Sequence, residues 1–375
     1  MIYLDNSATT YPKPESVYKA LDKANREFAF NAGRGMYKYA KETYNIIEDT
    51  RKGVAELADA SADNVAFFSS ATEALNLIIN GIGIGQGDNI FISCFEHNAI
   101  VRPLYNLKKT IDFNIIFIPF DKNTWELKEG ELNDLFTLSR PKAVLISHVS
   151  NVTGYILPYE KIFKLSRNFG AINVLDCAQS FGIIKPVIKD CDFIVFAGHK
   201  SLYASFGIAG FIDINDFHLN ITKTGGNGSD SLNHDMPEFG HGRYESGSEN
   251  SVAIIGLNSS IKWLKNNDIM KHERNLTKYL IKEMNKNVKL QLYLPANCDN
   301  IMGIVSFNIK GYPANDVGSI LAEEYDICVR TGYHCSPFIH KFLDSLKFSG
   351  TVRISMGAFT TKEDIDKLIE ALNTF

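Results

Sequence analysis

Short apolar runs alternate with amphipathic segments between about residues 60 and 215. The runs are NVAFFSS, NIFISCF, NIIFIPF, AVLISHVS, INVLDCAQS, CDFIVFAGHK and IAGFIDI. The segments between them, such as ATEALNLIING and YEKIFKLSRNFG, have helical spacing. Runs this apolar indicate strands buried on both faces, and the intervening helices indicate crossover connections. The pattern predicts an α/β layer built on a mostly parallel sheet.

The pattern changes after residue 250. Residues 223–250 are rich in Gly, Ser, Asn and His, and a loop of this length in a compact protein is more often functional than idle. From 251 long helical patterns come first, followed by the strand-like runs KLQLYLP, GIVSFNIK, ICVRTG and TVRISMGAF. We therefore expect a large domain over residues 16–250 and a smaller α+β domain over 251–375.

Composition narrows the class of protein. The chain has 375 residues, 45% of them hydrophobic and 22% charged, and a formal net charge of −4, which favours neither nucleic acids nor membrane surfaces as partners. The N-terminus lacks a signal-peptide pattern and no segment is apolar enough to span a bilayer, so we expect a cytoplasmic protein. The six cysteines form no C-x-x-C pair and no metal-ligand spacing, so neither a disulfide framework nor a metal site is expected.

Two ionisable residues follow apolar runs. Lys200, in FAGHKS, is either a surface lysine or an amine that is held in a pocket and can form a Schiff base. Asp176, in VLDCAQS, is either a helix cap or the partner of a cation such as a protonated pyridine nitrogen. Parallel sheets bind ligands at the carboxyl ends of their strands, where both residues are expected.

Other candidates lie at strand-to-helix junctions and inside a strand. Ser70 and Glu73 fit a capping box, and the helix that they begin is also a ready phosphate site. His97, in CFEHNAI, can cap a helix, stack on a planar ring or carry protons. Arg353, in GTVRISMGAF, needs a carboxylate partner, either structural or from a substrate.

Cys335 differs from the other cysteines. It lies in RTGYHCSP, outside any apolar run, directly after His334 and close to Arg330. A glycine that permits a bend and two cationic neighbours are what a mobile, reactive thiolate requires. We therefore expect Cys335 to be accessible and deprotonated, with His334 and Arg330 favouring the thiolate.

Nearly the whole chain resembles the class V aminotransferase family of pyridoxal 5′-phosphate (PLP) enzymes, specifically its cysteine desulfurase and selenocysteine lyase branch. The resemblance is carried, in order, by YLDNSATTYPKPESV, SSATEALNL, EHNA, HVSNVTG, DCAQ, GHK, RYESGSENSVAIIGL, RTGYHC and TVRISMGAF. It implies a large PLP-binding domain, a small C-terminal domain, and an N-terminal arm over residues 1–15 that packs with the small domain.

The resemblance also implies roles for individual residues. Lys200 would carry PLP as a Schiff base, His97 would stack on the ring, and Cys335 would attack the sulfur of the substrate. The remaining cofactor contacts would come from Ala71, Thr72, Asp176, Gln179, His199, Gly247 and Ser248. The last two would reach the phosphate of a neighbouring subunit, which implies a homodimer, and Asn151, Arg330 and Arg353 would bind the substrate.

The implied reaction converts L-cysteine into L-alanine and leaves a persulfide on Cys335, from which sulfur passes to an acceptor. Alternatives are a selenocysteine lyase, a cysteine-sulfinate desulfinase or, further away, another lyase on the same scaffold. Two positions depart from the family pattern. Ala197 replaces a serine or threonine that contacts phosphate, and Tyr333 stands where a histidine is common.

Overall fold

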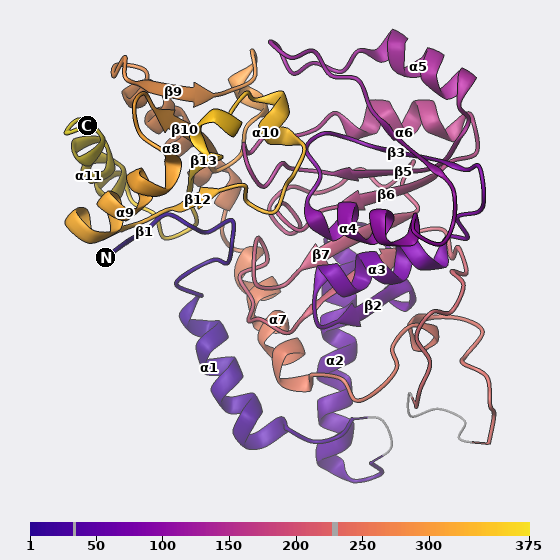
Figure 1. Ribbon diagram of the computed structural model, residues 1–375. Coiled ribbons are helices and arrows are strands. Elements are labelled where there is room, and N and C mark those ends of the chain that lie inside the picture. Colours follow the sequence, from indigo (N-terminus) through magenta and orange to yellow (C-terminus); the bar gives the residue numbers. More distant parts are fainter. Residues whose placement is uncertain (33–34, 227–231) are drawn as a thin grey trace.

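The computed structural model describes residues 1–32, 35–226 and 232–375 (Figure 1). Its large sheet has the strand order β2-β8-β7-β6-β5-β3-β4. Strands β3 to β7 run parallel to one another, and only β8 runs antiparallel to its neighbours β7 and β2. The strands are β2 (Val65–Phe68), β3 (Asn89–Ile92), β4 (Asn114–Phe117), β5 (Pro141–Ser147), β6 (Ile172–Asp176), β7 (Phe193–Ala197) and β8 (Ala209–Asp213). The expected α/β layer with a mostly parallel sheet is confirmed.

Both faces of the large sheet are covered by helices. Successive residues of β6 point to opposite faces, so Val174 packs in one core and Leu175 in the other. Helices α3 (Ala71–Gly81) and α4 (Asn98–Leu107) cover the first face. The second face is covered by α2 (Lys38–Glu56), α5 (Glu129–Leu138), α6 (Tyr159–Arg167) and α7 (Ser251–Leu264). This explains why the central strands are apolar without alternation.

One strand departs from the expected burial. The run that begins at Asn114 forms β4, which pairs only with β3 and lies at the edge of the sheet. Asn114 and Phe117 are exposed, and Phe117 retains 40% of its accessible surface. Apolar content alone does not distinguish an edge strand from a central one, because both can be rich in Ile and Phe.

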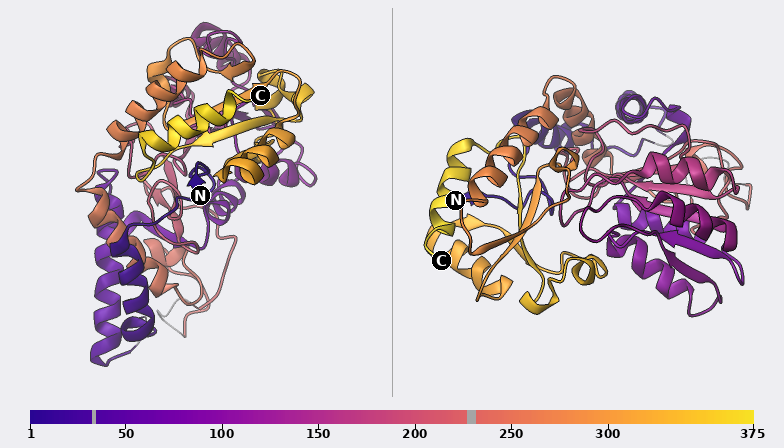
Figure 2. Two further views of the ribbon diagram at one scale, coloured as in Figure 1. Left: turned by 90° about the vertical axis from the view of Figure 1, so that its left-hand side faces the viewer. Right: turned by 90° about the horizontal axis from the view of Figure 1, so that it is seen from above.

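The small sheet is antiparallel, with the order β12-β13-β10-β9. Its core is closed by α8 (Ile269–Met284), α9 (Ala314–Tyr325) and α11 (Lys362–Leu372). The strands are β9 (Leu290–Tyr293), β10 (Ile304–Ile309), β12 (Arg330–Gly332) and β13 (Thr351–Ser355). Seen from above, this C-terminal layer lies beside the large sheet (Figure 2). The short helix α10 (Ile339–Phe342) follows the Cys335 turn.

The two ends of the chain meet at the small sheet. Strand β1 (Ile2–Tyr3) pairs in parallel with β11 (Ile327–Cys328), and Asp5 forms a bridge with Ser355. The arm then leads to α1 (Glu15–Lys23), which runs with α2 away from the C-terminal end in the left view of Figure 2. The domain limits remain a prediction. Helix α7 shares its core with the large sheet whereas α8 packs on the small one, so we propose a boundary between these two helices.

Among the described residues, no helix combines the length and the apolar character needed to cross a membrane.

Candidate active site

A small cavity of about 80 Å³ opens where the parallel strands end. Strands β5, β6 and β7 contribute residues at or just beyond their carboxyl ends, and α3 and α4 contribute their first turns. The lining includes eight of the predicted site residues: Ala71, Thr72, His97, Asn151, Asp176, Gln179, His199 and Lys200. The cavity, here called the lysine pocket, therefore brings together residues spread over about a third of the sequence.

Lys200 and Asp176 form the electrostatic centre of the lysine pocket. Desolvation lowers the pKa of the Lys200 ammonium, an effect that the negative charge of Asp176 opposes. Burial raises the pKa of the Asp176 carboxyl, while a hydrogen bond from the amide of Ala178 to Oδ1, at 2.9 Å, and the charge of Lys200 favour its ionised form. The result is an amine that is more readily neutral, and hence more nucleophilic, beside a buried acid whose Oδ1 is held by a backbone amide.

His97 begins α4 and lines the same pocket. Its Nδ1 accepts a hydrogen bond from the amide of Ala99 at 3.0 Å, so the neutral ring carries its proton on Nε2. Burial, followed by the charge of Lys200, lowers the pKa of His97 to about 3. The imidazole is therefore a helix cap and also an uncharged planar group that faces the cavity.

The first turn of α3 forms another wall of the pocket. Oγ of Ser70 accepts a hydrogen bond from the amide of Glu73 at 3.1 Å, as the sequence predicts. The reciprocal half of the expected capping box is wrong, because the Glu73 carboxylate binds the amide and the hydroxyl of Ser69 instead, as well as Lys223. The Glu73 carboxylate and Lys223 line a second pocket next to the lysine pocket. Ala71 and Thr72, the first two residues of α3, line the lysine pocket itself.

Arg353 belongs to β13 of the small sheet and is buried next to the lysine pocket. Nη1 donates to the carbonyl of Asn151 at 2.9 Å, and Nη2 forms an ion pair with Oδ1 of Asp5 at 2.5 Å. Arg330 lies directly opposite Arg353 in the sheet register. The Asn151 side chain in turn donates to the carbonyl of His334 at 2.7 Å. The three predicted substrate-binding residues are therefore neighbours, and Arg353 already has a structural carboxylate partner.

Cys335 lies exposed on a turn beside this group. His334 and Cys335 both have positive φ angles, 48° and 57°, and the Cys335 carbonyl accepts a hydrogen bond from the amide of Asn98 at 2.7 Å. Because Asn98 is the residue after His97, this bond fixes the cysteine turn at the rim of the lysine pocket.

The expected help of His334 to a thiolate is wrong. The His334 ring is 4% exposed and bonds Thr351 through Nε2. Burial and the charge of Arg353 keep its pKa well below the ordinary value, so at neutral pH the ring has no positive charge to offer the sulfur.

A family model for class V aminotransferases matches residues 2–368. This chain belongs to that family. It is 31% identical over 390 residues to a probable cysteine desulfurase of Pyrococcus abyssi, with 99% of this chain and 93% of that protein covered. It is 32% identical over 400 residues to a cysteine desulfurase of Wigglesworthia glossinidia brevipalpis, with 99% and 92% covered. The apo structure of a cysteine desulfurase from Thermococcus onnurineus has a TM-score of 0.92 at 28% identity, with 100% of this chain and 94% of that chain covered.

Enzymes of the class V aminotransferase family depend on PLP, and the lysine pocket fits that cofactor. Asp176 suits a protonated ring nitrogen, and Lys200 suits the aldehyde carbon. His199 gives the strongest evidence for this fit, because its Nδ1 is buried without a hydrogen-bond partner among the described residues. Burial, with the charges of Lys200 and Lys13, lowers the pKa of this ring to about 3. An orphaned ring nitrogen beside the free amides of α3 is what a phosphate group would satisfy.

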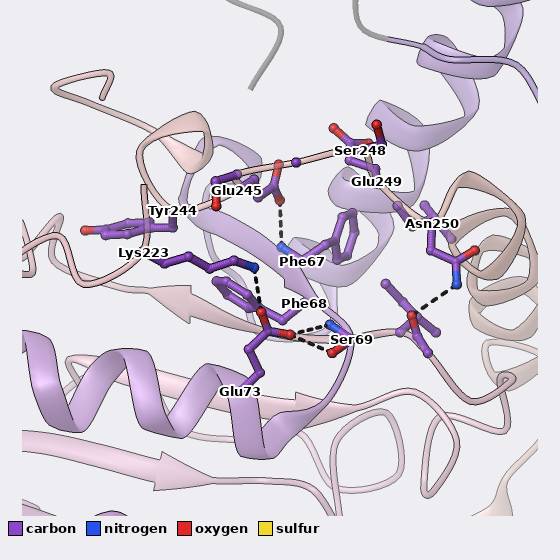
Figure 3. Close-up of a pocket in the computed structure, with 15 residues that line it drawn as sticks. Phe67, Phe68, Ser69, Glu73, Lys223, Tyr244, Glu245, Ser248, Glu249 and Asn250 are labelled. Carbon is purple, nitrogen blue, oxygen red and sulfur yellow. Dashed lines mark hydrogen bonds and ion pairs between the residues drawn. The ribbon is translucent and has the colours of Figure 1, made fainter. Parts of the chain in front are cut away.

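Gly247 and Ser248 lie outside the lysine pocket. They line a neighbouring cavity of about 310 Å³ with Phe67, Ser69 and Glu73, shown in Figure 3. Lys223 crosses this cavity to pair with Glu73 at 2.7 Å. Gly247 and Ser248 are both exposed and lie near the end of the long polar loop. Residues 227–231 of that loop lie outside the described residues. Within one subunit they are thus not brought to the lysine pocket.

Two groups of contacts around the site were not predicted from the sequence. In the N-terminal arm, Ser7 accepts from Gln179 and donates to the carbonyl of Asn151, and Lys13 bonds the carbonyl of His199. Behind the pocket, the buried Glu96 carboxyl binds the amide and hydroxyl of Ser147 at 2.8 and 2.7 Å. The contacts of the first group could not be predicted from local sequence, because these partners of Ser7 and Lys13 lie 144 to 186 positions away.

Proposed function

We propose that this chain is a PLP-dependent cysteine desulfurase, which converts L-cysteine into L-alanine and receives the sulfur on Cys335 as a persulfide. One observation carries the proposal. An exposed cysteine stands on a turn that is hydrogen-bonded to the start of α4, one residue from His97 in the lysine pocket. A transaminase or a β-elimination enzyme has no need for a thiol in that position.

When bound, PLP would supply an electron sink for charge that develops at the substrate Cα. Lys200 supplies the amine that binds its aldehyde, Asp176 the negative charge for its ring nitrogen, and His199 with Thr72 and the Ala71 amide the phosphate contacts. Gln179, which also lines the pocket, would bind the ring hydroxyl. His97 provides an uncharged ring that can stack on the cofactor without competing for a proton.

The residues around the substrate then have separate tasks. Arg353, Arg330 and Asn151 bind its carboxylate, and the neutral amine of Lys200 removes the Cα proton. The Cys335 thiolate attacks the sulfur of the substrate, so that a sulfur–sulfur bond forms as the carbon–sulfur bond breaks. The electron pair of the broken bond stays with the substrate, which takes up protons and leaves as alanine. A thiol donor or an acceptor protein then reduces or takes the persulfide.

The test is an assay of the products that are formed from L-cysteine, with and without a reductant. We expect alanine in both cases, with sulfide released in step with alanine only when the reductant is present. Pyruvate in place of alanine would identify an elimination enzyme and contradict the proposal. The alternatives, selenocysteine lyase and cysteine-sulfinate desulfinase, are separated by substrate comparison, since their leaving groups depart without a thiol nucleophile.

The proposal includes a homodimer, in which Gly247 and Ser248 of each subunit reach the cofactor phosphate of the other. Its support is that both residues are exposed at the edge of a cavity that lies outside the lysine pocket of their own subunit. A monomer of full activity, detected by light scattering at assay concentration, would exclude this arrangement. A cytoplasmic location and a sulfur-acceptor protein, for instance in iron–sulfur cluster assembly, belong to the same proposal.

A further inference from the structure

The N-terminal arm meets the substrate-binding group at a charged contact. Asp5 pairs with Nη2 of Arg353 at 2.5 Å, and next to it Ser7 donates to the carbonyl of Asn151 at 3.3 Å. The Ser7 amide is fixed in turn by Oγ of Ser355 at 2.9 Å. The Asp5 carboxylate is 21% exposed whereas the Arg353 side chain is 2% exposed, so the acid is the accessible partner of a buried cation.

One donor of the Arg353 guanidinium has no hydrogen-bond partner among the described residues. Nη1 is used by Asn151 and Nη2 by Asp5, but the buried Nε has no hydrogen-bond partner among the described residues. A buried donor without a partner is costly, and Nε with the second hydrogen of Nη2 forms a fork that matches a carboxylate. Arg353 therefore keeps donors that could bind a second carboxylate while Asp5 stays in place.

The charges of this group are consistent with a second carboxylate. Arg353 and Arg330 are paired residues on the neighbouring strands β13 and β12, and Asp5 is the carboxylate that is ion-paired to Arg353. Two guanidiniums and one carboxylate leave a net charge of about +1, which one further carboxylate neutralises. Without Asp5 the same group would hold about +2 and would attract that carboxylate more strongly.

We propose that Asp5 is a positioning residue that acts through Arg353: it serves as a resident carboxylate that pairs with the arginine and weakens the binding of every ligand carboxylate. The inference rests on the proposed function for its physiological meaning. Cysteine and alanine carry the same carboxylate, so a contact that binds both equally adds nothing to the chemical step and slows release of the product. Asp5 moderates that contact and lets alanine leave.

Asp5→Asn tests this inference because the amide keeps the Oδ1 acceptor for Arg353 and removes only the charge. In the PLP-loaded enzyme, we expect the Michaelis constant for cysteine and the inhibition constant for alanine to fall together by about tenfold. The effect should shrink as salt is added, since like charges are screened. Asp5→Ser, which also removes the charge, should change both constants in the same direction and serves if Asp5→Asn folds poorly.

The matched control is Asp326→Asn. Asp326 pairs with the terminal amine of Met1 at 2.6 Å, so its replacement loosens the same arm without touching Arg353. We expect both constants to remain as in the wild type. Constants that are unchanged or raised in Asp5→Asn, or lowered equally in Asp326→Asn, would overturn the inference.

A second probe separates failure of this inference from failure of the proposed function. 3-Hydroxypropionate has a carboxylate but no amine or sulfur, so its binding can be measured by ligand-observed NMR even if the protein turns over no cysteine. Asp5→Asn should bind it about tenfold more tightly than the wild type. Binding of 3-hydroxypropionamide, the neutral analogue, should be the same in both proteins, and an equal gain for the amide would contradict a charge effect.

Discussion

The lysine pocket and the cysteine turn hold their reactive groups in opposite ways. Lys200 follows a central strand of the large sheet, where desolvation lowers the pKa of its ammonium. Cys335 stands exposed on a turn with two consecutive positive φ angles, joined to the small sheet. An amine gains reactivity from burial because the neutral form is favoured, whereas a thiol that must meet a substrate and then an acceptor requires access.

The contrast extends to the neighbours of the two groups. The walls of the lysine pocket are secondary-structure ends, held by the registers of β5, β6 and β7. The cysteine turn is held by a few single bonds, such as Asn98 to the Cys335 carbonyl and Asn151 to the His334 carbonyl. Changes in the pocket should therefore affect cofactor binding, and changes at the turn should affect sulfur transfer alone.

Lys200→Ala should have the largest effect. Loss of both the covalent anchor and the proton-transferring amine should lower activity at least about a thousandfold, within the range that a general base contributes. The variant should lose the yellow absorbance of the lysine-bound cofactor. The control is Lys223→Ala, which removes the lysine of the neighbouring cavity and should retain the colour. Cofactor that borohydride still fixes to Lys200→Ala protein would refute the assignment.

Cys335→Ser should come next, and it isolates the turn from the pocket. A serine hydroxyl is not ionised at neutral pH and is a poor nucleophile towards sulfur, so sulfur release from cysteine should fall at least about a hundredfold. The cofactor absorbance should be normal, and selenium release from selenocysteine should persist. Cys298→Ser, which replaces another exposed thiol, should behave as the wild type. Loss of cofactor in Cys335→Ser would show that the turn and the pocket are not separable.

The sequence predicted the lysine pocket better than the surroundings of the cysteine turn, and the reason is physical. Lys200 and Asp176 follow apolar runs, and a parallel sheet brings the carboxyl ends of such runs to one edge. The position of Asp5 beside Arg353 depends on the pairing of β1 with β11, two strands of two residues each that carry no periodic signal. The burial of His334, which removes its charge, likewise depends on the packing of Thr351 above it.

Arg353→Ala should weaken substrate binding with the pocket intact. Removal of a charge-assisted partner from a buried carboxylate costs on the order of 2–5 kcal/mol, so the Michaelis constant for cysteine should rise at least about tenfold. Because Arg353 also pairs with Asp5, the melting temperature should fall as well. Asp5→Ala, which breaks the same ion pair, is the control for that second effect. A lower melting temperature with an unchanged Michaelis constant would make Arg353 a structural residue only.

Ser70→Ala should have the smallest effect, and it tests whether the wall of the lysine pocket acts as a phosphate site. Ser70 caps α3 through the amide of Glu73, and loss of such a cap costs about 1 kcal/mol of stability. The first turn of α3 would then fray, and the amides that are proposed to hold the phosphate would lose part of their alignment.

The cap and the phosphate contact can be told apart by the ligand that is titrated. We expect apoprotein carrying Ser70→Ala to bind PLP about fivefold more weakly, as a change of about 1 kcal/mol implies, and to bind pyridoxal, which lacks the phosphate, as the wild type does. Thr361→Ala removes the cap of α11 in the small domain and controls for a general loss of stability. Equal weakening of PLP and pyridoxal in Ser70→Ala would mean that the first turn of α3 shapes the pocket without holding the anion. The phosphate contacts would then have to come from His199 and from the neighbouring subunit of the proposed dimer.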